Sequence, residues 1–330
     1  MVAAGKLDTT RVDERRRESL LPLVILGGTD ARPVPLPDVA RDKHPLAGFK
    51  GVDVRIHGRP LVAELEERLL ASGVFSTLFL VGPAAVYRGV CASARLIDAN
   101  GSFGENIRAA VDAVEGRCPG SPIAFTSCDI LPEPAALRDV VDDYVRHAPS
   151  DLWFPLVRVP RDRSLGVSAW KPAYRIVPEA GEAAIRVLPS HLVVADTRTL
   201  RLDFLYRLFQ LGYRTRNRPI GHRRVVMVRG VILELLYQDL RSAVRLQSPG
   251  LTWSLLWNGL AAARDLRAGT ITREHLENAV RSILVRSTFR RRHPDRRVRL
   301  PIVDEMSLAL DIDTEEEAEA MGGAVRGQPP

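Results

Sequence analysis

The sequence predicts an α/β fold with a mostly parallel central sheet. Short apolar segments alternate with segments whose apolar residues recur at helical spacing, and turn residues separate the two kinds. Parallel strands joined by right-handed helical crossovers are the arrangement that this alternation favours. The chain has 330 residues, 45% of them hydrophobic and 26% charged, which allows a sizeable core and excludes a fully disordered chain or a small disulfide-stapled one.

The first half of the chain carries most of the strand–helix alternation. A Pro-rich loop over 29–51 and glycines at the helix and strand ends provide the breaks, and Gly73 ends the first long helix. The expected strands are 21–28, 74–82, 121–129 and 151–159, and the expected helices are 57–73, 101–116 and 133–148.

From about residue 196 the pattern becomes mostly helical. The helical segments are 198–212, 231–246, 251–269 and 271–289, after which a strand candidate at 298–313 and an acidic helix at 314–321 follow. A helical insertion before the last core strand explains this order better than two independent domains. The expected organisation is a mobile leader (1–20), a core (21–195), a helical insertion (196–297), the C-terminal part of the core (298–321) and a disordered tail (322–330).

Charge, apolar content and cysteine content indicate in which cellular compartment the protein resides and which partners it binds. The net charge of +7 comes almost wholly from arginine, since the chain has only four lysines, and no nucleic-acid-binding motif accompanies it. The start is polar, without the apolar run of a signal peptide, and the longest apolar stretches are too short and too charged to span a bilayer. Three cysteines without a CxxC pair indicate a reducing compartment. We expect a cytoplasmic protein that binds no nucleic acid.

The first candidate site is the turn after the strand 21–28. Gly27 and Gly28 allow backbone amides to approach a phosphate chain, and Arg32 could offset its charge. The segment is neither a Walker loop nor a Rossmann GxGxxG, so an ordinary tight turn is the competing interpretation.

The second candidate is Asp129, which directly follows an apolar strand. Open α/β sheets bind ligands at the carboxyl ends of their strands, and a carboxylate there suits Mg²⁺. The alternative is that Asp129 only caps the turn before Pro132. The third candidate is the pair Asp311 and Asp313, which point to opposite faces if the strand continues. Only one of these can then face the site, and the other can cap the acidic helix.

Five segments in this order resemble the MobA-like nucleotidyltransferases. They are LGG…R from Leu26, GRPLVAELEERLLASG, GSFGENIRAAVDAV, TSCDILPEPAAL and LDIDTEEEAEA. The resemblance covers roughly 21–159 and 298–321. It implies a GT-A-like (Rossmann-like) three-layer α/β/α sandwich that binds an NTP at the first glycine loop.

The resemblance also implies roles for individual residues. Asp129 and Asp313 would hold Mg²⁺; Gly27, Gly28 and Arg32 would form the phosphate loop; and Asn106 would lie near the nucleotide base. The lysine that neutralises the NTP phosphates is either Lys43 or Lys50, and the sequence does not decide between them. The glycine loop departs from the usual LAAGxGxRxG pattern, so a non-catalytic nucleotide-binding protein stays a competing interpretation.

The resulting hypothesis is a Mg²⁺-dependent nucleotidyltransferase. It would transfer a nucleoside monophosphate from an NTP to a phosphorylated small-molecule acceptor and release pyrophosphate. The alternative enzyme is a GT-A glycosyltransferase that uses a nucleotide-sugar.

Two further segments bear on partners. The basic run 286–301 is either a solvated loop or an anion site. The helix that carries Trp253 and Trp257 has one apolar face, which packs in the core or forms a homodimer contact; a peripheral membrane contact is the least favoured interpretation.

Overall fold

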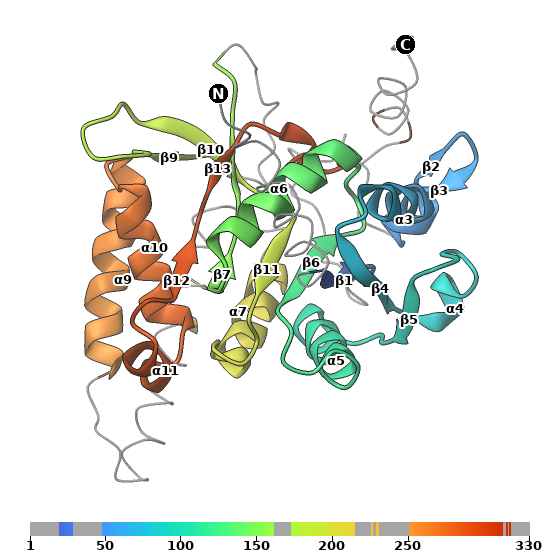
Figure 1. Ribbon diagram of the computed structural model, residues 1–330, viewed down its shortest axis with the longest axis horizontal. Helices are drawn as coiled ribbons and strands as arrows, with labels where there is room; N and C mark the ends of the chain where they lie inside the picture. The colour runs from blue at the N-terminus through green and yellow to red at the C-terminus, as the bar shows by residue number, and fades with distance from the viewer. Residues whose placement is uncertain are drawn as a thin grey trace, which may run out of the picture.

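The computed structural model describes residues 20–28, 48–161, 173–214 and 251–312, together with positions 226, 229, 230, 315 and 317; the side chains of 213, 214, 251–256 and 258 are not described. Within these residues the chain forms a central sheet of seven strands, a second sheet of four and a small hairpin of two. Figure 1 shows the central sheet between helices on both faces.

The central sheet has the order β12-β7-β11-β6-β1-β4-β5. Its strands are β1 (Leu21–Leu26), β4 (Phe75–Gly82), β5 (Arg95–Asp98), β6 (Ile123–Ser127), β7 (Ser150–Trp153), β11 (Val193–Ala195) and β12 (Arg297–Arg299). β1 pairs in parallel with both β4 and β6, whereas β11 is antiparallel to both β6 and β7. The strand order reverses at β1, since the chain goes to one side for β4 and β5 and to the other for β6.

The second sheet has the order β13-β8-β10-β9 and lies beyond the carboxyl end of β7. Its strands are β8 (Leu156–Arg158), β9 (Tyr174–Ile176), β10 (Ile185–Pro189) and β13 (Ile302–Val303), and the hairpin is formed by β2 (Arg55–Ile56) and β3 (Arg59–Pro60). The segment 151–159, expected as one strand, is therefore two strands in two sheets. Pro155 separates them, because proline cannot donate to a sheet ladder.

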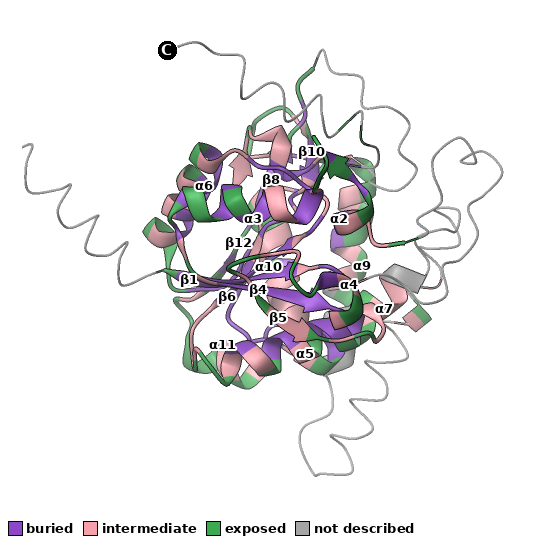
Figure 2. Cartoon of the chain, turned by 90° about the vertical axis from the view of Figure 1, so that its right-hand side faces the viewer, coloured by how far each residue is buried: buried purple, intermediate pink, exposed green. Residues whose placement is uncertain are grey.

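Helices lie on both faces of the central sheet (Figure 2). The helices are α2 (Lys50–Asp53), α3 (Leu61–Ser72), α4 (Ala84–Tyr87), α5 (Phe103–Glu115), α6 (Pro134–His147), α7 (Leu202–Arg214), α9 (Leu251–Ala268), α10 (Arg273–Leu284), α11 (Ser287–Arg292) and the 3₁₀ turn η2 (Met306–Leu308). Of these, α9 packs against α10 and against β9 of the second sheet. Local sequence sets their ends: Gly73 closes α3 in the left-handed conformation, Ser102 and Glu105 form a capping box on α5, and Pro134 opens α6.

Two hydrophobic cores lie on opposite faces of the central sheet. Alternation along β1 feeds both, since Leu23 and Ile25 pack in the core beneath α3 and α6 while Val24 packs in the core beneath α5. Burial on both faces explains why β1 reads as a continuous apolar run. The predicted fold class, an α/β/α sandwich with a largely parallel sheet, is confirmed.

The helical region between β11 and β12 includes α7, α9, α10 and α11, and both flanking strands belong to the central sheet. The expected helix 231–246, the tail 322–330 and the leader up to residue 19 lie outside the described residues. On α9, Trp257 is 70% exposed, so this residue does not pack in a core; the side chain of Trp253 is not described. None of the helices in the described parts of the chain combines the length and the apolar character that a membrane span needs.

Candidate functional site

The candidate site lies where the strand order reverses, at the carboxyl ends of β1 and β6. In open α/β sheets this position forms a crevice between oppositely directed crossovers, and ligands bind there. Gly27 and Gly28 follow β1, and Asp129 follows β6 after one intervening residue. Parallel pairing of β1 with β6 brings these two chain segments side by side.

The glycine turn is packed too tightly for any side chain. A Cβ at Gly27 would lie 2.8 Å from Cζ of Tyr87, and one at Gly28 would lie 2.3 Å from Nδ2 of Asn106. The Tyr87 hydroxyl also donates a hydrogen bond to the Gly27 carbonyl, at 2.5 Å. The two glycines are therefore required by their neighbours in the fold, whether or not a phosphate approaches them.

Asn106 holds the other side of this turn. It lies in the first turn of α5, is 3% exposed, and accepts a hydrogen bond from the Gly101 amide at 2.9 Å through Oδ1. Its Nδ2 faces Gly28. The structure thus brings Gly28 and Asn106 together, and the burial of Asn106 suits it to fix the turn.

Lys50 is the described lysine that reaches the site. It begins α2, and its Nζ lies 3.5 Å from Oδ2 of Asp129. Gly51 allows α2 to pack closely against Cys128, the residue before Asp129, since a Cβ at position 51 would lie 3.1 Å from the Cys128 sulfur. Lys43 and Arg32, the other predicted basic residues, lie outside the described residues.

A second carboxylate and an imidazole meet Asp129. One ligand atom from each of Asp129, His191 and Asp311 lies within 4.8 Å of the other two. Nε2 of His191 contacts Oδ1 of Asp311, and Nδ1 of the same ring lies 3.0 Å from Oγ of Ser127. Oδ1 of Asp129 is buried and has no hydrogen-bond partner among the described residues.

Backbone hydrogen bonds hold the C-terminal segment at this site. The Ile312 amide donates to the Asp129 carbonyl at 2.8 Å, and the His191 amide donates to the Leu308 carbonyl at 2.7 Å. These contacts place Asp311 beside Asp129. The predicted ligand Asp313 lies outside the described residues.

His191 is the site residue that the sequence analysis did not identify. It precedes β11, a strand of three residues that was not predicted. Because β11 is antiparallel to β6, its beginning meets the carboxyl end of β6. A polar residue before a short apolar run, LVVA, was the available signal, and it is weak.

Cys128, next to Asp129, is not suited to act as a nucleophile. Burial, together with the nearby Asp129 charge, raises the pKa of this thiol to about 12. The thiol therefore stays protonated at neutral pH, and a reaction at this site would proceed without a cysteine thiolate.

The chain was compared with protein-family models, with curated protein sequences and with solved structures. No protein-family model and no curated protein sequence matches the chain. A CMP:2-keto-3-deoxy-manno-octonic acid synthetase complexed with CTP aligns with 93% of this chain and 100% of its own, at 9% identity and a TM-score of 0.46. The 4-diphosphocytidyl-2C-methyl-D-erythritol synthase of Anaerococcus prevotii DSM 20548 aligns over 93% and 99%, at 7% identity and a TM-score of 0.42. Another 4-diphosphocytidyl-2C-methyl-D-erythritol synthase aligns over 58% and 78%, at 9% identity and a TM-score of 0.36.

Proposed function

We propose that the chain is a metal-dependent nucleotidyltransferase that moves a nucleoside monophosphate from an NTP to a phosphorylated small-molecule acceptor and releases pyrophosphate. The observation that carries this proposal is the cluster of Asp129, His191 and Asp311 beside the glycine turn, with Lys50 next to it. These groups combine ligands for a cation with a positive charge for phosphate, at the edge of the sheet where ligands bind. The resemblance of five sequence segments to the MobA-like nucleotidyltransferases supports the same reaction.

The three side chains fit a divalent cation. Oδ1 of Asp129 is a buried carboxylate oxygen without a hydrogen-bond partner in the described residues, so a cation would satisfy it. When His191 donates from Nδ1 to Ser127, Nε2 presents its lone pair toward the two carboxylates. Two carboxylates suit Mg²⁺, the predicted ion, and they suit Mn²⁺ as well, while the imidazole is a better ligand for a transition metal than for Mg²⁺. Both Mg²⁺ and Mn²⁺ therefore belong in the test.

The chain's own residues would act by position and charge. An oxygen of the acceptor phosphate attacks the α-phosphorus of the NTP. The bond between the α-phosphorus and the oxygen that bridges it to the β-phosphorus breaks, and pyrophosphate leaves with the electron pair of that bond. Lys50 would offset charge that develops on the phosphates, and Arg32 is proposed for the same role. A cation held by Asp129, His191 and Asp311 would supply further charge stabilisation and orient the phosphates. The glycine turn, which Tyr87 and Asn106 hold in place, would form a rigid backbone surface against which the phosphates bind.

Pyrophosphate release tests this proposal. The protein is incubated with each of five NTPs, with Mg²⁺ or Mn²⁺, and with a panel of phosphorylated sugars and polyols. We expect one NTP to give pyrophosphate in a one-to-one ratio with a nucleotide–acceptor product. Asp129→Asn should lower the rate about a hundredfold or more, because charge stabilisation in the transition state is lost.

Asp295→Asn is the matched control, since Asp295 is an exposed aspartate away from the site. Its rate should equal that of the wild type. Full turnover by Asp129→Asn would refute the assigned site. Consumption of a nucleotide-sugar without any pyrophosphate from an NTP would instead identify a glycosyltransferase.

A further inference from the structure

Both carboxylates of the candidate site have basic partners within the chain. Nζ of Lys50 lies 3.5 Å from Oδ2 of Asp129, and Nε2 of His191 contacts Oδ1 of Asp311. These four side chains are between 19% and 32% exposed, so solvent screens their charges only in part. The Lys50 ammonium is therefore next to any cation that Asp129 would hold.

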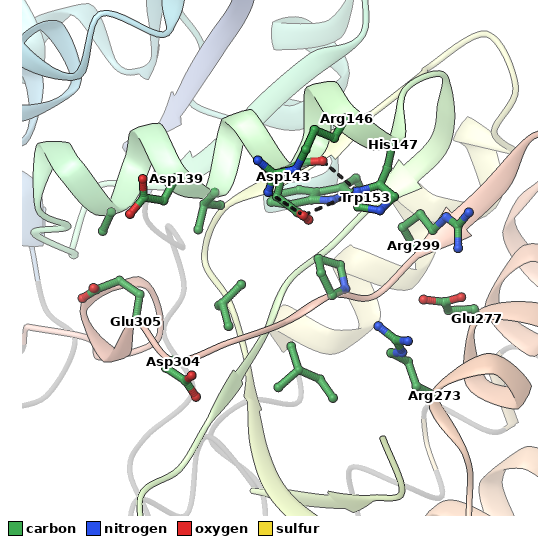
Figure 3. Close-up of a pocket in the computed structure, with 15 residues that line it drawn as sticks. Asp139, Asp143, Arg146, His147, Trp153, Arg273, Glu277, Arg299, Asp304 and Glu305 are labelled. Carbon is green, nitrogen blue, oxygen red and sulfur yellow. Dashed lines mark hydrogen bonds and ion pairs between the residues drawn. The ribbon is translucent and has the colours of Figure 1, made fainter. Parts of the chain in front are cut away.

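Charge pairs of another kind line a pocket of about 610 Å³ between α6, α10 and the segment that runs from β12 to β13. Figure 3 shows Arg146 and His147 turned toward Asp143, and all three residues belong to α6. Arg273 of the same pocket lies 3.9 Å from Glu179. Carboxylates and basic groups pair with each other there, so the lining favours a ligand of neither sign. The Lys50 pair differs, because its carboxylate is itself a proposed cation ligand.

The residue before Lys50 links it to the glycine turn. The Phe49 and Tyr87 rings meet edge to face with their centroids 5.9 Å apart, and the Tyr87 hydroxyl donates a hydrogen bond to the Gly27 carbonyl. Lys50 thus stands between Asp129 and the turn where the NTP phosphates are proposed to bind. A lysine ammonium is carried on a flexible four-carbon stem, which suits it to change partners over a short distance.

A cation on Asp129 and the Lys50 ammonium compete for the same carboxylate. Like charges this close repel each other, and the repulsion is stronger where water is partly excluded. An NTP offers the ammonium another partner, since its phosphates are negatively charged and lysine is a common phosphate-binding residue. Phosphates at the glycine turn would therefore draw Lys50 from Asp129 and free that carboxylate for the cation.

We propose that Lys50 couples the binding of the nucleotide to the binding of the cation. Without either ligand it neutralises Asp129, and when both bind its ammonium exchanges that carboxylate for the NTP phosphates. The cation then binds weakly alone and tightly with an NTP, and by linkage the NTP gains affinity from the cation by the same factor. This coupling rests on the proposed function, in which the cation and the NTP share one site.

Mn²⁺ binding, measured from the electron paramagnetic resonance signal of free Mn²⁺, tests the coupling without turnover. The full chain is titrated alone and with each of five NTPs, with no acceptor present, and Mn²⁺ bound by the NTP in solution is measured separately. Without nucleotide, Lys50→Met should bind Mn²⁺ about tenfold or more tightly than the wild type, because the competing charge is gone. The factor by which an NTP tightens Mn²⁺ binding should fall about tenfold in the same variant.

Two further variants are controls. Lys50→Arg keeps a positive charge beside Asp129, so its Mn²⁺ affinity without nucleotide should stay close to that of the wild type. Arg117→Met removes one positive charge at an exposed position beyond the far end of α5, and both quantities should be unchanged in it.

The outcomes separate this coupling from the proposed function. Equal Mn²⁺ affinity of the wild type and Lys50→Met without nucleotide, or an unchanged effect of the NTP, would overturn the coupling and leave the proposed function standing. Tighter Mn²⁺ binding in Arg117→Met or in Lys50→Arg, by the same factor as in Lys50→Met, would also overturn it. Absence of Mn²⁺ binding in all four proteins, with and without each NTP, would refute the proposed function and the coupling together.

Discussion

Gly28 and Asn106 are in a contact that leaves no room for a methyl group. A Cβ on residue 28 would lie 2.3 Å from Nδ2 of Asn106, whose side chain is held by the Gly101 amide. Gly28→Ala should therefore lower the free energy of unfolding by about 1–3 kcal/mol, as overpacking does in other cores. Urea denaturation of the two proteins measures this difference.

The double variant Gly28→Ala/Asn106→Ala separates the clash from other effects of the alanine. Asn106→Ala alone loses a buried hydrogen bond, but it also makes room for the new methyl group. The double variant should be more stable than the sum of the two single effects predicts. Additive losses would show that the clash is not what makes Gly28 necessary.

At the scale of the elements, a buried ion-pair network ties α10 and the turn before β12 to β7 and to the end of β11. Arg296 donates to Asp151 at 2.9 Å and to Asp196 at 2.7 Å, and Arg281 donates to Asp151 at 3.0 Å. Asp151 and Asp196 are 0% and 1% exposed. Part of the basic run 286–301 thus neutralises buried carboxylates and is neither a solvated loop nor a surface anion site.

Removing the shared arginine should destabilise the fold strongly. Arg296→Ala leaves two buried carboxylates short of a partner and should cost about 3–5 kcal/mol of unfolding free energy. Its neighbour Arg297 is exposed, so Arg297→Ala should change the same quantity by less than about 0.5 kcal/mol. Equal effects of the two substitutions in urea denaturation would contradict the structural role of the network.

The same network makes stability depend on pH. Burial alone would raise the pKa of Asp196, but the hydrogen bonds and charges of Arg198 and Arg296 outweigh it and hold the pKa below its ordinary value. A carboxyl with a lowered pKa in the folded state stabilises the fold above its unfolded-state pKa of about 4, and this contribution is lost as the pH falls through the lowered value.

Asp196→Asn tests this sign. The variant should be less stable than the wild type at pH 7, and the gap in unfolding free energy should narrow as the pH falls below about 4. Asp295→Asn is the control at an exposed position. A gap that stays constant across this range would show that ionisation of Asp196 does not contribute.

A helix or strand could be predicted where its own residues carry a clear apolar pattern or a capping signal. β1, α5 and α6 carry apolar runs and capping residues that act locally, so sequence periodicity identified them. β11 has three residues and depends on pairing with β6 and β7, which periodicity does not report. The segment 298–313 was expected as one strand, but β12 and β13 lie in different sheets and η2 follows. Alternation of Asp311 and Asp313 was therefore no guide to which carboxylate faces Asp129.

At the scale of the whole molecule, topology explains why distant residues meet. Lys50, Asp129, His191 and Asp311 come from four separate segments, and the reversal of strand order at β1 gathers those segments at one edge of the sheet. The positions of Asp129 and the glycines could be predicted because each lies within two residues of a strand end. His191 could not, since its place depends on an antiparallel strand. The predicted roles of Arg32, Lys43 and Asp313 stay predictions.

This edge of the sheet is proposed to bind an NTP together with a divalent cation. The most direct test is the thermal stability of the chain with GTP, CTP, UTP, ATP or dTTP, each with and without Mg²⁺ or Mn²⁺, in the wild type, Asp129→Asn and Asp295→Asn. A ligand that binds only the folded state adds about 2.7 kcal/mol at a hundredfold excess over its dissociation constant. We predict a cation-dependent rise in Tm with one NTP that is lost in Asp129→Asn and kept in Asp295→Asn. A rise that persists in Asp129→Asn, or no rise with any NTP and cation, would contradict the account.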